Sequence, residues 1–86
     1  MTVTFFGRVT QYTNGEKSYS PDNHQTLQGL ISELGEHYGE EFLSFVHGDE
    51  KCIILVNSKG ITLSGGLDTA LKPDDKIEIL PFVDAG

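Results

Sequence analysis

One segment near the middle of the chain repeats apolar residues with the spacing of a helix. They recur at i, i+3, i+4, i+7 and i+11, forming a stripe along one helical face: Leu27, Leu30, Ile31, Leu34 and Tyr38. Thr26 or Asn23 can cap the start, and Gly39 supplies a left-handed stop. The solvent side carries three acidic residues: Glu33, Glu36 and Glu40. Because Gly29 and Gly35 each cost about 1 kcal/mol relative to alanine, the helix must be stabilised by packing its stripe against another layer.

Five other segments have the composition of β-strands. They are residues 3–9, 16–20, 53–56, 61–63 and 76–82. Asn14-Gly15 favours a hairpin turn between the first two segments, and Pro73-Asp74-Asp75 interrupts the chain before the last. The run at 53–56 is apolar throughout, so we interpret it as the most buried strand or as an edge strand under the helix.

The order of these elements predicts the architecture. The chain runs strand, strand, helix, strand, short strand and strand, with one main helix to cover one face of a mixed sheet of four to five strands. The first and last strands are then expected to pair in parallel at the centre. This is the α+β arrangement called the β-grasp. We expect residues 1–86 to form a single domain, because a chain of this length suffices for one domain and is too short for two.

Charge and cysteine content exclude several classes of function. Thirteen acidic residues against six basic ones give a net charge of −7, which opposes binding to nucleic acid or to an anionic membrane. The single cysteine, Cys52, cannot form an intrachain disulfide, and the three histidines show no metal-ligand spacing. No apolar run or signal segment points to a membrane or to export, so we expect a cytoplasmic protein. No nucleophile–base pair is visible, and we expect it to be non-enzymatic.

The second half of the chain carries short motifs in a specific order. Val56-Asn57 precedes a turn and a short strand. Residues 66–77 read Gly-Leu-Asp-Thr-Ala-Leu-Lys-Pro-Asp-Asp-Lys-Ile, and residues 80–83 read Leu-Pro-Phe-Val. Together with the Phe5-Phe6 strand and the capped helix, these motifs resemble the ubiquitin-like sulfur carriers, namely the small subunit of molybdopterin synthase and the sulfur carrier of the thiamine pathway. The resemblance covers nearly the whole chain and implies a ubiquitin-like β-grasp fold.

In that family the reactive group is the carboxylate of the C-terminal glycine. A partner enzyme adenylates it with ATP, and it then becomes a thiocarboxylate that donates sulfur. For this chain the resemblance implies that Gly86 is the reactive residue and that Val83, Asp84 and Ala85 are the flexible tail, residues 83–86, that threads into the partner. The family usually ends in Gly-Gly, so Ala85 is a departure. Its methyl group adds bulk in a channel built for glycine. We nevertheless expect the tail to remain competent for adenylation.

Side-chain alternation along the first and last strands predicts a partner-binding surface. If Ile77 and Ile79 face the helix, Leu80 and Phe82 point the other way, as Phe6 does on the first strand. Central pairing of these strands would gather Phe6, Leu80 and Phe82 into an apolar patch on the uncovered face. We interpret this patch as the docking surface for the adenylating enzyme or a synthase subunit. The alternative is that these are scattered surface aromatics without a role.

The sequence therefore predicts a sulfur carrier, with the molybdopterin route to a molybdenum or tungsten cofactor favoured by Phe5-Phe6 and by chain length. The resemblance implies two protein partners: an adenylating, E1-like enzyme that uses ATP, and a molybdopterin synthase large subunit or equivalent sulfur acceptor. It implies no cofactor bound by the chain itself. Two alternatives stay open. One is a non-catalytic β-grasp binding module, which Ala85 favours, and the other is a ubiquitin-like modifier that joins Gly86 to lysines.

Overall fold

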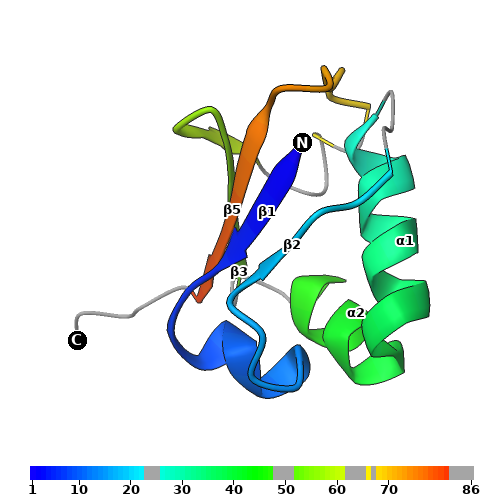
Figure 1. Cartoon of the computed structure of the whole chain (residues 1–86), viewed down its shortest axis with the longest axis vertical. Coiled ribbons are helices and arrows are strands. Elements are labelled where there is room, and N and C mark those ends of the chain that lie inside the picture. The colour runs from blue at the N-terminus through cyan, green and yellow to red at the C-terminus, as the bar shows by residue number, and fades with distance from the viewer. Residues whose placement is uncertain (23–25, 48–51, 62–65, 67, 82–86) are drawn as a thin grey trace.

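The described residues form a five-stranded mixed sheet with helices on one side of it (Figure 1). The computed structural model describes residues 1–22, 26–47, 52–61, 66 and 68–81. In chain order the elements are β1 (Thr2–Phe5), the 3-10 helix η1 (Gly7–Tyr12), β2 (Ser18–Tyr19), α1 (Leu27–Tyr38), α2 (Glu40–His47), β3 (Cys52–Val56), β4 (Lys59–Ile61) and β5 (Lys76–Pro81). Neither α-helix in this part of the chain has the length and hydropathy needed to cross a bilayer.

The strand order is β2-β1-β5-β3-β4, with the first and last strands adjacent at the centre. β1 and β5 run parallel, with Val3 opposite Ile77 and Phe5 opposite Ile79. β3 lies antiparallel on the other side of β5, and β4 and β2 are the two edges. The predicted central parallel pair and the α+β β-grasp class are therefore confirmed.

The core lies between one face of this sheet and the two helices. The sheet contributes alternate residues, as strand geometry requires: Val3, Phe5, Ile54, Val56, Ile77 and Ile79. The helix α1 contributes the predicted stripe: Leu27, Leu30, Ile31 and Leu34. Thr26 caps α1, since its Oγ1 accepts a hydrogen bond from the backbone N of Gly29 at 3.3 Å. Gly39 ends the helix with φ of 102°, a conformation that glycine adopts readily.

The first strand is shorter than the sequence predicted. We expected it to run to Val9, but it ends at Phe5, and Gly7 begins η1 with φ of 57°. This left-handed backbone turns the chain out of the sheet, and Val9 enters the core from η1 instead of from a strand. The Asn14-Gly15 turn is present, with φ of 56° and 80°, but it closes a longer connection and β2 keeps two residues.

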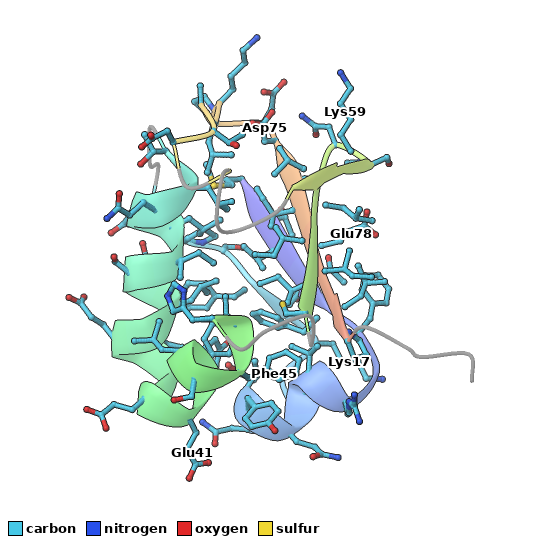
Figure 2. The ribbon with its side chains drawn as sticks, turned by 180° about the vertical axis from the view of Figure 1, so that it is seen from behind. Lys17, Glu41, Phe45, Lys59, Asp75 and Glu78 are labelled. Atoms are coloured by element: carbon cyan, nitrogen blue, oxygen red, sulfur yellow. The ribbon has the colours of Figure 1, made fainter. Side chains whose placement is uncertain are left out.

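The short helix α2 was missed. The sequence predicts one main helix, yet Phe42, Phe45 and Val46 also follow helical spacing and are all buried. Phe42 is fully buried, with its ring edge-on to Phe5 at 6.0 Å between centroids. Phe45 stacks on Tyr12 of η1 at 4.7 Å, and Figure 2 shows it between the helices and η1. This helix packs against α1, β3 and η1.

The apolar run at 53–56 alternates in burial instead of being buried throughout. Ile54 and Val56 face the core, whereas Ile53 and Leu55 are half-buried on the other face. β3 is also an interior strand and not an edge, because β5 and β4 lie on its two sides. The predicted strand at 61–63 corresponds to β4 at residue 61 only. Residues 62 and 63, like Asn23, fall outside the described part of the chain.

Asp75 closes the turn that precedes β5. Its carboxylate accepts hydrogen bonds from Nδ2 of Asn57 and from the backbone N of Lys72, both at 2.8 Å. These two bonds, that from Asn57 first, lower the pKa of Asp75 below its usual value. Since Asn57 lies in the turn between β3 and β4, the contact joins two turns at the same end of the sheet (Figure 2).

We expect Asp75→Asn to lower the free energy of unfolding at neutral pH and to flatten its decline in acid. A carboxylate whose pKa is depressed in the folded state stabilises the fold above the unfolded-state pKa of about 3.9. That contribution is lost as the pH falls through the folded-state pKa. Urea denaturation at a series of pH values measures it. Asp74→Asn, at the exposed neighbouring position, is the matched control, and an equal effect in both variants would contradict the role given to Asp75.

Candidate functional site

The face of the sheet opposite the helices carries an apolar patch. Four side chains contribute to it, and we call them the sheet-face patch: Phe6, Ile53, Leu55 and Leu80. In the antiparallel register of β3 and β5, Leu80 lies opposite Ile53 and Glu78 opposite Leu55. Side chains in such directly opposed pairs approach to about 5 Å between Cβ atoms. Three elements that are distant in sequence therefore join into one surface.

Phe6 extends this surface beyond the end of β1. Its backbone is still extended, with φ of −113° and ψ of 148°, and its N donates a hydrogen bond to the carbonyl of Ile79 at 3.0 Å. The Phe6 side chain therefore alternates away from Phe5 and lies beside Leu80. It is 38% exposed, and among the described residues it is the exposed large hydrophobic side chain. An aromatic ring in this position loses water when a partner covers it.

The backbone next to Phe6 keeps this end of the sheet compact. Gly7 has positive φ, and a Cβ atom at this position would lie 3.4 Å from Cγ of Pro81. Pro81 is the last described residue of β5, so the end of β5 packs directly against the turn that follows the patch aromatic. The patch is thereby placed at the end of β5 from which the chain continues to its C-terminal residues.

Polar residues lie along one side of the patch. Thr4 and Glu78 lie side by side in the parallel register of β1 and β5. Both are half-buried, and Figure 2 shows Glu78 pointing away from the helices. An apolar centre with polar edges is the usual anatomy of a protein interface.

The predicted partner-binding residues are thus partly placed by the structure. Phe6 and Leu80 share the uncovered face, as the alternation predicted. Phe82 lies outside the described residues, as do Val83, Asp84, Ala85 and Gly86. Sequence reasoning missed Ile53 and Leu55, because a continuous apolar run suggested burial on both sides. The signal that could have found them is the alternation of the run once Ile54 and Val56 are assigned to the core.

Cys52 does not have the environment of a reactive thiol. It is half-buried at the start of β3, opposite Pro81, and packs against the core. Burial raises the pKa of the Cys52 thiol to about 11. The thiol is therefore protonated at neutral pH, whereas nucleophilic cysteines have depressed pKa values.

Two tyrosine–carboxylate hydrogen bonds attach the β2 region to α1. Tyr19 donates to Oε2 of Glu33 at 2.6 Å, which, with burial, raises the pKa of Tyr19 to about 12. Tyr38 donates to Oε1 of Glu16 at 2.7 Å, and burial and this bond together raise its pKa. Glu33 is consequently half-buried and bonded, not part of a solvated row as the sequence predicted. These contacts are structural. Among the described residues no cluster of His, Cys, Asp and Glu could hold a metal ion.

Comparison with known proteins identifies the family. The model described as the ThiS family matches residues 3–86, which is nearly the whole chain. The chain belongs to the ThiS family. Its structural neighbours are ubiquitin-like sulfur carriers, so the resemblance noted from the sequence motifs is confirmed. A comparison with curated proteins found no match.

Three solved structures illustrate how this ThiS-family chain compares with its relatives. It is 30% identical to CysO of Mycobacterium tuberculosis, with a TM-score of 0.77 over 95% of this chain and 98% of that one. It is 26% identical to a chain of the BexX/CysO complex of Amycolatopsis orientalis, with a TM-score of 0.78 over 99% and 98%. It is 29% identical to a chain of the complex between subunits 1 and 2 of the molybdopterin-converting factor of Helicobacter pylori, with a TM-score of 0.65 over 99% and 96%.

Proposed function

We propose that this protein carries sulfur as a thiocarboxylate on Gly86. The observation that carries the proposal is the ThiS-family match, which extends to residue 86. In the proposed reaction, a partner enzyme joins the Gly86 carboxylate to the α-phosphate of ATP and releases pyrophosphate. A hydrosulfide or equivalent sulfur donor then attacks the acyl carbon, and AMP leaves. One carboxylate oxygen is thereby replaced by sulfur, and no group of the carrier itself is oxidised or reduced.

The chain supplies the Gly86 carboxylate and a surface that the partner recognises, and the partner catalyses the reaction. Activation of a carboxylate needs a nucleotide site that excludes water, which a domain of 86 residues has little room to build. We therefore propose that the chain is not itself an enzyme, that it binds no cofactor and that ATP binds to the E1-like partner. Its place of action would be the cytoplasm.

The test is the intact mass of the protein after incubation with ATP, a sulfide donor and an adenylating enzyme from the same genome. A gain equal to the mass difference between sulfur and oxygen, located in the C-terminal peptide, is the expected result. Omission of ATP should prevent it. An unchanged mass with every adenylating enzyme that the genome encodes would overturn the proposal.

The acceptor that we propose for the sulfur is a molybdopterin precursor, bound by a synthase large subunit. The support is the 29% identity, across 99% of this chain, to a chain of the Helicobacter pylori molybdopterin-converting factor. The thiocarboxylated protein, mixed with that large subunit and the pterin precursor, should return to its carboxylate mass as molybdopterin forms. Because the chain is equally similar to CysO, a sulfur acceptor other than a molybdopterin precursor is the alternative. If the protein kept its sulfur in this assay, that other acceptor would be favoured.

We expect Phe6→Asp to reduce binding to the adenylating enzyme or the large subunit by at least about thirtyfold, because aromatic anchors of interfaces contribute about 2–4 kcal/mol. A charge at this position would also have to be desolvated in the complex. Isothermal titration calorimetry measures the change in affinity. Ser44→Asp, which adds the same charge at an exposed site on α2, should bind normally. Unchanged affinity of the Phe6 variant would show that the sheet-face patch is not the docking surface.

The alternative of a binding module without carrier chemistry is supported by the same surface. The described part of the sheet-face patch is assembled from β3, β5 and Phe6, which follows β1, and does not require Gly86. A binding module would bind its partner equally well without the last two residues, whereas a carrier would lose its reaction. The effect of removing these residues therefore distinguishes the two functions.

A further inference from the structure

A groove opens between α1 and α2, on the helical side of the sheet. It has a volume of about 330 Å³. From α1 it is lined by Ile31, Ser32, Gly35 and Glu36, and from α2 by Leu43 and His47. The volume is at the lower end of the range of about 300–1,000 Å³ for ligand sites. Because the groove is open to solvent, it suits side chains projecting from a partner better than an enclosed small molecule.

Close approach of the two helices gives the groove an apolar floor. Gly35 is buried, and a Cβ atom at this position would lie 2.6 Å from Cγ of Leu43. The missing side chain lets Leu43 lie across α1, beside the buried Ile31. Leu43 itself is only half-buried, so apolar surface remains accessible in the groove. Ser32, Glu36 and His47 are exposed and form its rim.

The charge around this groove is one-sided. Residues 27–47 contain four glutamates and no lysine or arginine. The basic residues of the described part of the chain lie elsewhere: Arg8, Lys17, Lys59, Lys72 and Lys76. Figure 2 shows Glu41 on the helical side and Lys17 and Lys59 on the other. The potential around the groove is therefore negative, which attracts cationic ligands and repels anionic ones.

We propose that the groove between α1 and α2 binds a basic amphipathic helix of a protein partner. The apolar floor would take aliphatic side chains at i, i+3 or i+4 of that helix. Lysine or arginine side chains beside them would face Glu36 on the rim. The groove and the sheet-face patch lie on opposite sides of the sheet, so this second partner could bind while the first remains in place (Figure 1).

The same charge argument disfavours other occupants. A second copy of this chain would bring an equally acidic helical layer against the groove, and like charges in contact oppose association. Phosphate groups of nucleic acids or lipids would meet the same repulsion. The proposal does not depend on sulfur transfer, since it uses neither the sheet-face patch nor Gly86.

The experiment titrates the protein with a capped synthetic helix that has leucine at i, i+3, i+4 and i+7 and lysine at the other positions. Amide chemical shifts followed by NMR should change first for the groove residues, Ser32, Glu36, Leu43 and His47. Two comparison peptides replace leucine with serine or lysine with glutamate. Both should bind at least about tenfold more weakly, because each removes one of the two complementary features.

Matched variants distinguish binding at the groove from nonspecific attraction of the peptide to an acidic protein. Glu36→Gln should weaken binding of the leucine–lysine peptide about two- to fivefold, the effect of one exposed charge pair. Asp74→Asn removes the same charge at an exposed turn position outside both surfaces and should leave the affinity unchanged. Ser32→Arg should weaken binding by about tenfold or more, because it fills the groove and repels the ligand. Unchanged shifts elsewhere would show that each variant is folded.

Several outcomes would overturn the proposal. They are the absence of binding at millimolar peptide, equal binding of the serine–lysine peptide, and equal weakening by Glu36→Gln and Asp74→Asn. Shift changes at the groove on raising protein concentration alone would show that a second copy of the chain is the occupant instead.

Discussion

Removal of Ala85 and Gly86 should abolish thiocarboxylate formation while leaving the fold and partner binding intact. The reacting carbon in the proposed reaction belongs to Gly86, and loss of two residues withdraws the carboxylate by about 7 Å along an extended chain. A displacement of about 1 Å can already reduce a rate a hundredfold. We therefore expect no sulfur-containing product in the intact mass after incubation with ATP, sulfide and the adenylating enzyme. Affinity for that enzyme should fall far less than activity.

Ala85→Gly is the matched control for this truncation. It restores the Gly-Gly ending of the resembling family, keeps the chain length and removes one methyl group, so it should react at least as fast as the natural sequence. If the truncated protein bound its partner normally and no variant ever acquired sulfur, the binding-module alternative would replace the carrier. Truncation that left the sulfur reaction unchanged would show that Gly86 is not the reactive residue.

Phe42→Ala should destabilise the fold by about 3–5 kcal/mol, the cost of deleting a fully buried aromatic side chain. Phe42 is fully buried, and it contacts the rings of Phe5 and Tyr38. Since small domains have about 5–15 kcal/mol of total stability, this single change removes a large part of it. We expect Tm to fall by at least about 12 °C. Thermal unfolding followed by circular dichroism measures the shift.

Phe6→Ala is the control, because it makes the same substitution at a solvent-accessible position. Phe6 is 38% exposed and beyond the end of β1, so its truncation should cost about 1 kcal/mol or less. Conversely, Phe6→Ala should weaken partner binding. If both substitutions destabilised the protein equally, Phe6 would be a core residue and the sheet-face patch would lose its aromatic member.

The main helix could be predicted closely because its signals are local. The stripe from Leu27 to Leu34, the Thr26 cap and the Gly39 stop are all present in α1. The second helix was missed although Phe42, Phe45 and Val46 have helical spacing. Eight residues hold too few turns for a periodicity to be distinguished from chance, and a helix of this length is not stable alone. Its stability comes from burial against α1, β3 and η1.

The candidate site was predictable only in part, because it depends on which strands are neighbours. Phe6 and Leu80 could be assigned to one face from alternation once a central parallel pair was assumed. Ile53 and Leu55 entered the patch through the antiparallel register of β3 with β5, which no local signal specifies. The groove between the helices depends likewise on the contact of Gly35 with Leu43, eight residues apart.

By itself the sequence determined the order of the five strands and the main helix, the net charge and the family motifs. These follow from composition, short-range periodicity and turn residues, each of which acts within a few positions. Only the tertiary structure decided that β1 stops at Phe5, that α2 exists, and which face of β3 is exposed. Those features arise from packing between distant segments, where burial of apolar surface outweighs local preference.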